Sequence, residues 1–272
     1  MFHLKEILIR TLSGIVFLIV VIGSILLHPI AFLFVFGVFT VIGLYEYYTL
    51  TGIAGKANKM IFVFIGLLLY GLLAFIGIGK ADITYALFIF LIFPLVITFQ
   101  LYEKEINWYH IGSIFTGYFY VAVPFGLLNT FFAFSYHESF PGFLLVSMLV
   151  IVWCNDIFAY LTGSFFGKHK LFERISPKKT WEGFFGGLLF ALLSAYVMSL
   201  FSKSLSVTEW LVLATVIVVT ATIGDLSESM LKRNAGVKDS GNLMPGHGGV
   251  LDRFDAVLFA TPFVFIYLKF IL

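Results

Sequence analysis

The residues of this sequence whose types and spacing could do chemistry are concentrated between Ser229 and Asp255. Cations and carboxylates lie there on both sides of a glycine-rich turn, Pro245-Gly246-His247-Gly248-Gly249. The charged residues of the segment are Lys232, Arg233, Lys238, Asp239, Asp252, Arg253 and Asp255. Glycines let backbone N–H groups approach a ligand closely, and carboxylates hold hard cations that bridge phosphate oxygens. The pattern favours a site for a metal-bound polyphosphate, and the alternative is a solvated loop between membrane helices.

Two carboxylate pairs flank this segment. Asp225 and Glu228 are three residues apart, as are Asp252 and Asp255. Residues at this spacing share one face of a helix, so each pair could present two carboxylates together. With the basic, glycine-rich segment between them, the pairs predict a cradle for a divalent metal ion. His247 lies among glycines, where a lone histidine is as often structural as catalytic.

Two further polar groups come earlier in the chain. Asn155-Asp156 lies inside an apolar run, where a lipid-facing carboxylate would cost several kcal/mol, so we expect it to face the protein interior or a wet cavity. The alternative is an aspartate that is held neutral or hydrogen-bonded to a neighbouring helix. The second group begins the next apolar run and contains Ser176, Lys178, Lys179, Thr180 and Glu182. A capped helix start explains this group about as well as phosphate binding does.

The composition indicates an all-α, polytopic integral membrane protein. Hydrophobic residues make up 60% of the 272 positions and charged residues only 12%. A water-soluble core of this size does not need so much apolar surface. The net charge of +2 does not suggest a nucleic-acid partner. Cys154 is the single cysteine, so an intrachain disulfide is impossible.

Nine apolar runs are long enough to be membrane spans, although the last is short. They cover about 11–27, 29–45, 60–79, 83–101, 111–134, 143–166, 181–201, 207–223 and 256–272. If every run crosses, all Lys and Arg residues except Lys80, Lys203 and Lys269 lie on one side. This asymmetry predicts a cytoplasmic N-terminus. Pro94 and Pro124 predict kinks in their spans.

The two halves of the chain differ in their polar content. Residues 1–142 carry few polar groups at depth, and we interpret them as scaffold helices. Residues 143–272 form the predicted catalytic region, with cytoplasmic loops at 167–180 and 226–255.

The polar segments resemble the signature of the phosphatidate cytidylyltransferases, also called CDP-diacylglycerol synthases. The resemblance is carried by Ser229-x-Leu231-Lys232-Arg233, by Lys238-Asp239, and by the stretch from Pro245 through Gly248, Gly249, Asp252 and Arg253 to Asp255. Met244 departs from the Leu, Ile or Phe of the pattern. Residues 176–183 and Asn155-Asp156 are also similar to family segments, so the likeness is close over roughly 150–256.

The resemblance implies a magnesium-dependent enzyme, with one or two cations bound, that makes CDP-diacylglycerol and pyrophosphate from CTP and phosphatidic acid. It also implies a many-helix membrane fold and a homodimer. The ligands implied for the metal are Asp225, Asp252 and Asp255. The further catalytic residues implied are Lys232, Arg233, Lys238, Asp239, His247 and Arg253. Substrate binding is implied for Asn155, Asp156, Ser176, Lys178, Lys179, Thr180, Glu182, Gly248 and Gly249.

Two other functions are compatible with part of the pattern. A CTP-dependent lipid-alcohol kinase would share the membrane burial and the basic metal site, but it would need a base for a hydroxyl group. A secondary transporter would explain a buried Asp156. It would not explain why the densest charge lies in a cytoplasmic loop, and we find no inverted repeat.

Overall fold

The computed structural model describes residues 2–53, 55–102, 107–241, 243 and 248–272. Contacts between residues divide the chain into two units. The first unit comprises Met1–Thr130 together with Asn234–Arg253, and the second comprises Phe131–Arg233 together with Phe254–Leu272.

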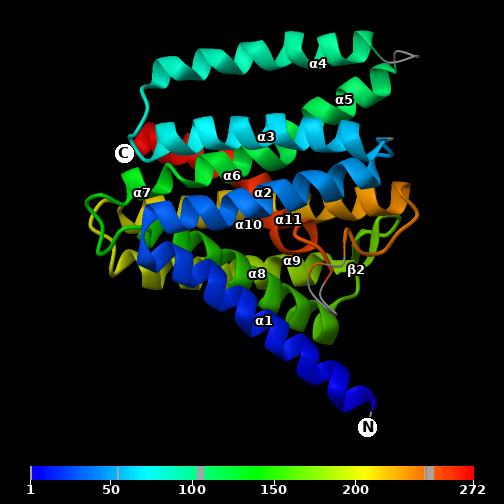
Figure 1. Ribbon diagram of the computed structural model, residues 1–272. Coiled ribbons are helices and arrows are strands. Elements are labelled where there is room, and N and C mark those ends of the chain that lie inside the picture. Colours follow the sequence, from blue (N-terminus) through cyan, green and yellow to red (C-terminus); the bar gives the residue numbers. More distant parts are fainter. Residues whose placement is uncertain (1, 54, 103–106, 242, 244–247) are drawn as a thin grey trace. The chain divides into compact units, whose positions relative to one another are not determined.

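The first unit consists of helices. They are α1 (Phe2–Leu27), α2 (Pro29–Leu50), α3 (Lys56–Gly77), the 3-10 helix η1 (Ile83–Leu91), α4 (Ile92–Leu101), α5 (Trp108–Gly117), the π-helix η2 (Tyr118–Ala122) and α6 (Val123–Leu128). Helix α2 packs on α1 and α3 (Figure 1). Its start is set by Pro29 and by the His28 side chain, which accepts a hydrogen bond from Ile30 N at 3.1 Å.

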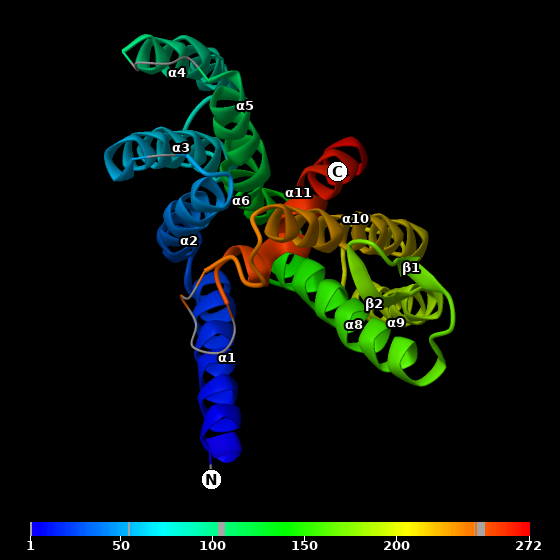
Figure 2. The same ribbon diagram turned by 90° about the vertical axis from the view of Figure 1, so that its right-hand side faces the viewer.

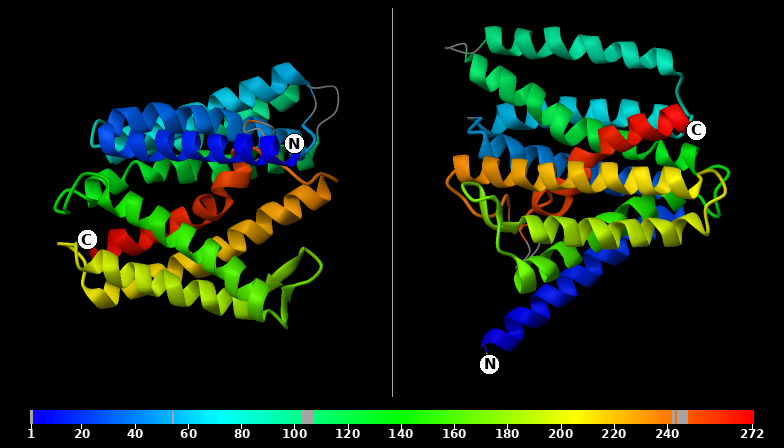
Figure 3. Two further views of the ribbon diagram at one scale, coloured as in Figure 1. Left: turned by 90° about the horizontal axis from the view of Figure 1, so that it is seen from below. Right: turned by 180° about the vertical axis from the view of Figure 1, so that it is seen from behind.

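The predicted spans around Pro94 and Pro124 both change helix type near the proline. The span 83–101 begins as η1 and becomes α4 two residues before Pro94. The π-turn η2 lies directly before α6, which contains Pro124. Proline lacks the N–H of a regular helical turn, and altered turns next to it absorb the mismatch. The run from α5 to α6 packs against α3 (Figure 3).

The second unit contains a long helical hairpin. Its elements are α7 (Phe131–Phe134), α8 (Phe143–Phe166), β1 (Lys170–Phe172), β2 (Ser176–Thr180), α9 (Trp181–Ser199), α10 (Val207–Asn234) and most of α11 (Leu251–Ile271). Helices α8 and α9 lie side by side, and the antiparallel pair β1–β2 connects them (Figure 2). The strands pair Lys170 with Thr180 and Phe172 with Ser176. Both strands lie within the predicted loop 167–180.

Glycines allow α8 and α9 to approach closely. A Cβ on Gly187 would lie 2.5 Å from Asn155 Oδ1 and 3.0 Å from Ala159 Cβ. The rings of Phe158 and Phe190 stack at a centroid distance of 3.5 Å along the same interface. Small residues at such positions are a common way for membrane helices to pack.

Eight helices of the described chain are long and apolar enough to cross a membrane, and Thr11–Leu27 is a shorter apolar helix. The all-α polytopic membrane fold is therefore confirmed. Helix α10 ends at Asn234 instead of Ile223, and α11 begins at Leu251 instead of Ala256. Helical residues consequently cover both ends of the predicted loop 226–255. Polar residues mark where a helix leaves the apolar layer, but the helix itself can continue beyond them. The 28 residues of α10 span about 42 Å.

Candidate active site

The start of α9 is built by Thr180 and Glu182. The Thr180 hydroxyl accepts a hydrogen bond from Gly183 N at 3.1 Å, so Thr180 is the N-cap residue of the helix. Glu182 accepts hydrogen bonds from the backbone N–H groups of Lys168 and His169 at 3.1 and 3.2 Å. The Nδ1 atom of His169 lies 2.6 Å from Glu182 Oε1. Glu182 thus holds the start of the connection between α8 and α9, residues 167–180, at the positive end of α9.

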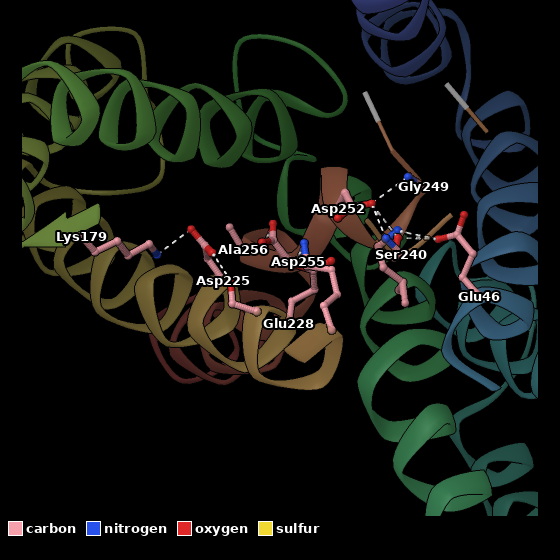
Figure 4. A network of polar contacts seen from close by, with 12 residues as sticks. Glu46, Lys179, Asp225, Glu228, Ser240, Gly249, Asp252, Asp255 and Ala256 are labelled. Carbon is pink, nitrogen blue, oxygen red and sulfur yellow. Dashed lines mark hydrogen bonds and ion pairs between the residues drawn. The ribbon is translucent and has the colours of Figure 1, made fainter. Parts of the chain in front are cut away.

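Two ion pairs lie on the last turns of α10. Lys179 Nζ is 2.5 Å from Asp225 Oδ2 (Figure 4). Lys232 Nζ is 2.5 Å from Glu228 Oε2. Glu228 is buried with 1% exposure, whereas the Asp225 side chain is 40% exposed. The β1–β2 connection therefore brings one of its lysines onto the predicted metal ligand Asp225.

Asp255 adds a carboxylate to this cluster. It lies close enough to Asp225, Glu228 and Asp156 for their charges to repel one another. Its Oδ1 accepts a hydrogen bond from Ala256 N at 2.7 Å. Asp156 is exposed in the middle of α8 and accepts a hydrogen bond from Asn155 Nδ2 at 3.2 Å. The buried Oδ1 of Asn155 has no hydrogen-bond partner among the described residues.

The charges of the second unit suit a divalent cation. Asp156, Asp225, Glu228 and Asp255 supply four carboxylates, and their ion-pair partners supply two ammonium groups. Oxygen ligands with surplus negative charge are the donor set that magnesium prefers. The described part of the chain holds no group of three or more His, Cys, Asp or Glu side chains already arranged around one point. The residues therefore fit the metal in donor type and charge, with Asp225 paired to Lys179 in this structure.

A separate polar network in the first unit involves Asp252 and Glu46. Asp252 Oδ2 accepts hydrogen bonds from Ser240 N and Gly249 N, both at 2.8 Å. Glu46 Oε1 accepts a hydrogen bond from Val250 N at 3.1 Å. Glu46 Oε2 accepts from Leu251 N at 3.0 Å. The Ser240 hydroxyl lies 2.8 Å from Asp252 Oδ2 and 3.1 Å from Glu46 Oε2.

Gly248 and Gly249 lie against carboxylates of the chain itself. A Cβ at Gly248 would collide with Asp252 Oδ2, and a Cβ at Gly249 would collide with both Glu46 oxygens. Gly248 also has a φ of +82°, which residues other than glycine rarely adopt. The Gly249 N–H that we expected to face a substrate donates to Asp252 in this structure.

The other predicted site residues differ in their settings. Ser176 is half-buried, and five residues are exposed: Lys178, Arg233, Lys238, Asp239 and Arg253. His247 lies outside the described residues. Sequence reasoning missed Glu46 and Ser240, and it noted Glu228 only as a neighbour of Asp225. Glu46 stands near the end of an apolar run, where an interfacial residue is expected, and its partners lie about two hundred positions further along the chain. A single sequence carries no signal for such a contact.

The chain is similar to known nucleotidyltransferases of bacteria. The model of the "Cytidylyltransferase family" matches residues 8–271. The "Phosphatidate cytidylyltransferase" of Haemophilus influenzae is 41% identical over 162 residues, which are 57% of this chain and 56% of that protein. The protein of that name from Staphylococcus epidermidis is 47% identical over 135 residues, 48% of this chain and 51% of the relative. The one from Bacillus subtilis is 35% identical over 198 residues, 70% of this chain and 68% of the relative. The matches to the first two proteins span little more than half of their lengths. With a family model that matches nearly from end to end, this chain belongs to the cytidylyltransferase family.

Proposed function

We propose that the protein transfers the cytidylyl group of CTP to phosphatidic acid, forming CDP-diacylglycerol and pyrophosphate. The observation that carries this proposal is the cluster of Asp225, Glu228 and Asp255 with Lys179 and Lys232, placed at the polar end of apolar helices. Such a cluster suits a reaction between a soluble polyphosphate and a membrane lipid phosphate. The relatives described above carry the name of this activity. They are bacterial, so we place the protein in the cell membrane as a multi-pass protein.

The reaction brings two anions together. An oxygen of the phosphatidic acid phosphate forms a bond to the α-phosphorus of CTP, and the bond from that phosphorus to the β-phosphate oxygen breaks. Pyrophosphate leaves with the electron pair of the broken bond. The lipid phosphate is already a nucleophile near neutral pH, so no residue of the chain needs to form a covalent intermediate.

Cationic side chains make this approach possible. Lys178 is exposed beside the start of α9 and can hold the lipid phosphate. The exposed Arg233, Lys238 and Arg253 can offset charge on the triphosphate and on the leaving pyrophosphate. Lys179, paired with Asp225 here, can turn to a phosphate once another cation takes its place.

Asp225 and Asp255 would hold a magnesium ion, and Asp252 remains a further ligand predicted from the sequence. When bound, the ion would neutralise phosphate oxygens and stabilise the in-line displacement. The ion pair with Lys179 and the hydrogen bond from Ala256 N to Asp255 Oδ1 hold the two carboxyl groups in position until then.

The function is tested by pyrophosphate release. The purified protein in mixed micelles should release pyrophosphate from CTP and magnesium only when phosphatidic acid is present, in equal amount with a cytidine-containing lipid. A transporter would release none. A lipid-alcohol kinase would release CDP and would require diacylglycerol instead of phosphatidic acid.

We also propose a homodimer, which the family resemblance implies. Light scattering of the detergent-solubilised protein, corrected for bound detergent, should give twice the mass of one chain. A monomeric mass at all protein concentrations would contradict this.

A further inference from the structure

Glu46 is a buried glutamate that belongs to the N-terminal helices and contacts the glycine-rich segment. It lies in α2, with 7% of its surface exposed. A charged side chain that is buried needs hydrogen-bond partners or an opposite charge. Among the described residues, Glu46 forms no ion pair, and its donors are two backbone N–H groups and the Ser240 hydroxyl. All of these donors come from residues 240–251.

The two backbone donors lie at the start of helix α11. Leu251 is the first residue of that helix and Val250 precedes it. The first N–H groups of a helix have no partner within the helix, and the helix dipole favours negative charge there. A residue just before the helix usually supplies the cap. Here the cap comes from Glu46 on α2, about two hundred residues earlier in the chain.

The same contact explains two glycines of the segment. A Cβ at Gly241 or Gly249 would collide with the Glu46 carboxylate. The helix N-terminus is therefore occupied by a carboxylate of the chain, although this kind of site often binds a phosphate. The N–H groups of Val250 and Leu251 are therefore not available to a substrate phosphate in this structure.

We propose that Glu46 is a positioning residue for cytidylyl transfer. It holds Ser240, Val250 and Leu251 and thereby sets the position of Asp252 and Arg253, which follow directly on α11. The predicted effect of Glu46 on turnover rests on the proposed function. Its predicted effect on the position of Val250 does not depend on that function.

Glu138 offers a matched control. It is also 7% exposed, and it accepts hydrogen bonds from the Ser202 hydroxyl and from the backbone N–H groups of Lys203 and Ser204. Its contacts are of the same kind and number as those of Glu46, but they hold a connection that carries no proposed site residue. Glu46→Gln and Glu138→Gln therefore each replace a hydrogen-bond-accepting carboxyl oxygen with an NH₂ group, at two different places in the chain.

The first measurement follows the segment and needs no activity. In a Cys154→Ala background, Val250→Cys places a thiol at a position with no exposed surface. A water-soluble maleimide reacts with it only when the segment opens. Both carboxyl oxygens of Glu46 accept hydrogen bonds, and Gln replaces one of these acceptors with an NH₂ donor. Glu46→Gln should therefore raise the labelling rate about tenfold or more. Glu138→Gln should leave the rate unchanged. Equal rates in the two variants would overturn the proposal.

The second measurement follows turnover without the added thiol. Small displacements of reacting groups lower rates strongly, so Glu46→Gln should lower kcat about tenfold or more. The KM for phosphatidic acid should stay as it is in the wild type, and Glu138→Gln should keep its kcat. A Glu46→Gln protein with faster labelling but wild-type kcat would also overturn the proposal.

Ser240→Ala covers the case in which Glu46→Gln does not fold. It removes only the hydroxyl between the two carboxylates and should change labelling and kcat in the same directions, by less. No change in either quantity would contradict the proposal. If the wild-type protein forms no cytidine-containing lipid, the proposed function fails, while the labelling rates still decide whether Glu46 holds the segment.

Discussion

Asp225, the metal ligand that we propose, is paired with Lys179 of β2. Its Oδ2 atom is paired with Lys179 Nζ at 2.5 Å, and its side chain is accessible enough for a ligand to reach. An ammonium group and a metal ion on the same carboxylate repel each other. Binding of magnesium at Asp225 should therefore release Lys179 toward phosphate.

The Asp225→Asn variant should lose about a hundredfold or more in kcat, because a neutral amide replaces a charged oxygen ligand. Glu209→Gln is the control, since Glu209 lies on the same helix and caps its first turn through Ser206. Steady-state formation of the cytidine-containing lipid measures both. Near-wild-type activity of Asp225→Asn at ordinary magnesium would remove Asp225 from the site.

The lysines at 178 and 179 should differ in their effects, because one is exposed and the other is paired with Asp225. Lys178→Ala should mainly raise the KM for phosphatidic acid, by about tenfold for one lost charge-assisted contact. Lys238→Ala, in the other basic segment, should instead raise the KM for CTP or lower kcat. If Lys178→Ala weakens CTP alone, the lipid phosphate binds elsewhere.

At the scale of the elements, helix α9 depends on close contact with α8. Gly187→Ala would place its Cβ 2.5 Å from Asn155 Oδ1 and should destabilise the protein by about 1–3 kcal/mol, as overpacking does. Gly71→Ala is the control, because nothing lies within 4 Å of the added atom in α3. Thermal unfolding in detergent, followed by circular dichroism, compares the two. A Gly187→Ala protein as stable as Gly71→Ala would show that the helices can separate without cost.

The sequence predicted the apolar elements well and their polar ends poorly. Runs of apolar residues locate the spans because a helix that crosses a membrane faces lipid or other helices, and both surroundings favour apolar side chains. Helix α10 continues eleven residues past Ile223, since Glu228 and Lys232 pair one turn apart and support the helix. The strands β1 and β2 were missed because three and five residues give too short a pattern.

For the candidate site, spacing along one helix could be predicted, and contacts across the chain could not. The pairing of Asp225 with Glu228 on one helix follows from the helical repeat. The contacts of Lys179 with Asp225 and of Glu46 with Val250 depend on how distant parts of the chain pack. No property of either residue alone indicates its partner.

At the scale of the whole molecule, the distribution of Lys and Arg predicts that both basic segments face the cytoplasm. In a Cys154→Ala background, cysteines at the exposed Glu173 and Val237 should react with a membrane-impermeant maleimide added from the cytoplasmic side. A cysteine at Lys203 should react only from the opposite side. Labelling of Glu173 or Val237 positions only from the side that labels Lys203 would contradict the nine-span topology.

The central claim concerns which phosphorus of CTP is attacked, and the fate of labelled CTP tests it most directly. The wild-type protein is incubated with magnesium, phosphatidic acid and CTP labelled with ³²P at either the α- or the γ-position. Attack at the α-phosphorus should place the α-label in the lipid product and the γ-label in pyrophosphate. A γ-label that appears in lipid, or an α-label that stays entirely in water-soluble nucleotide, would contradict cytidylyl transfer.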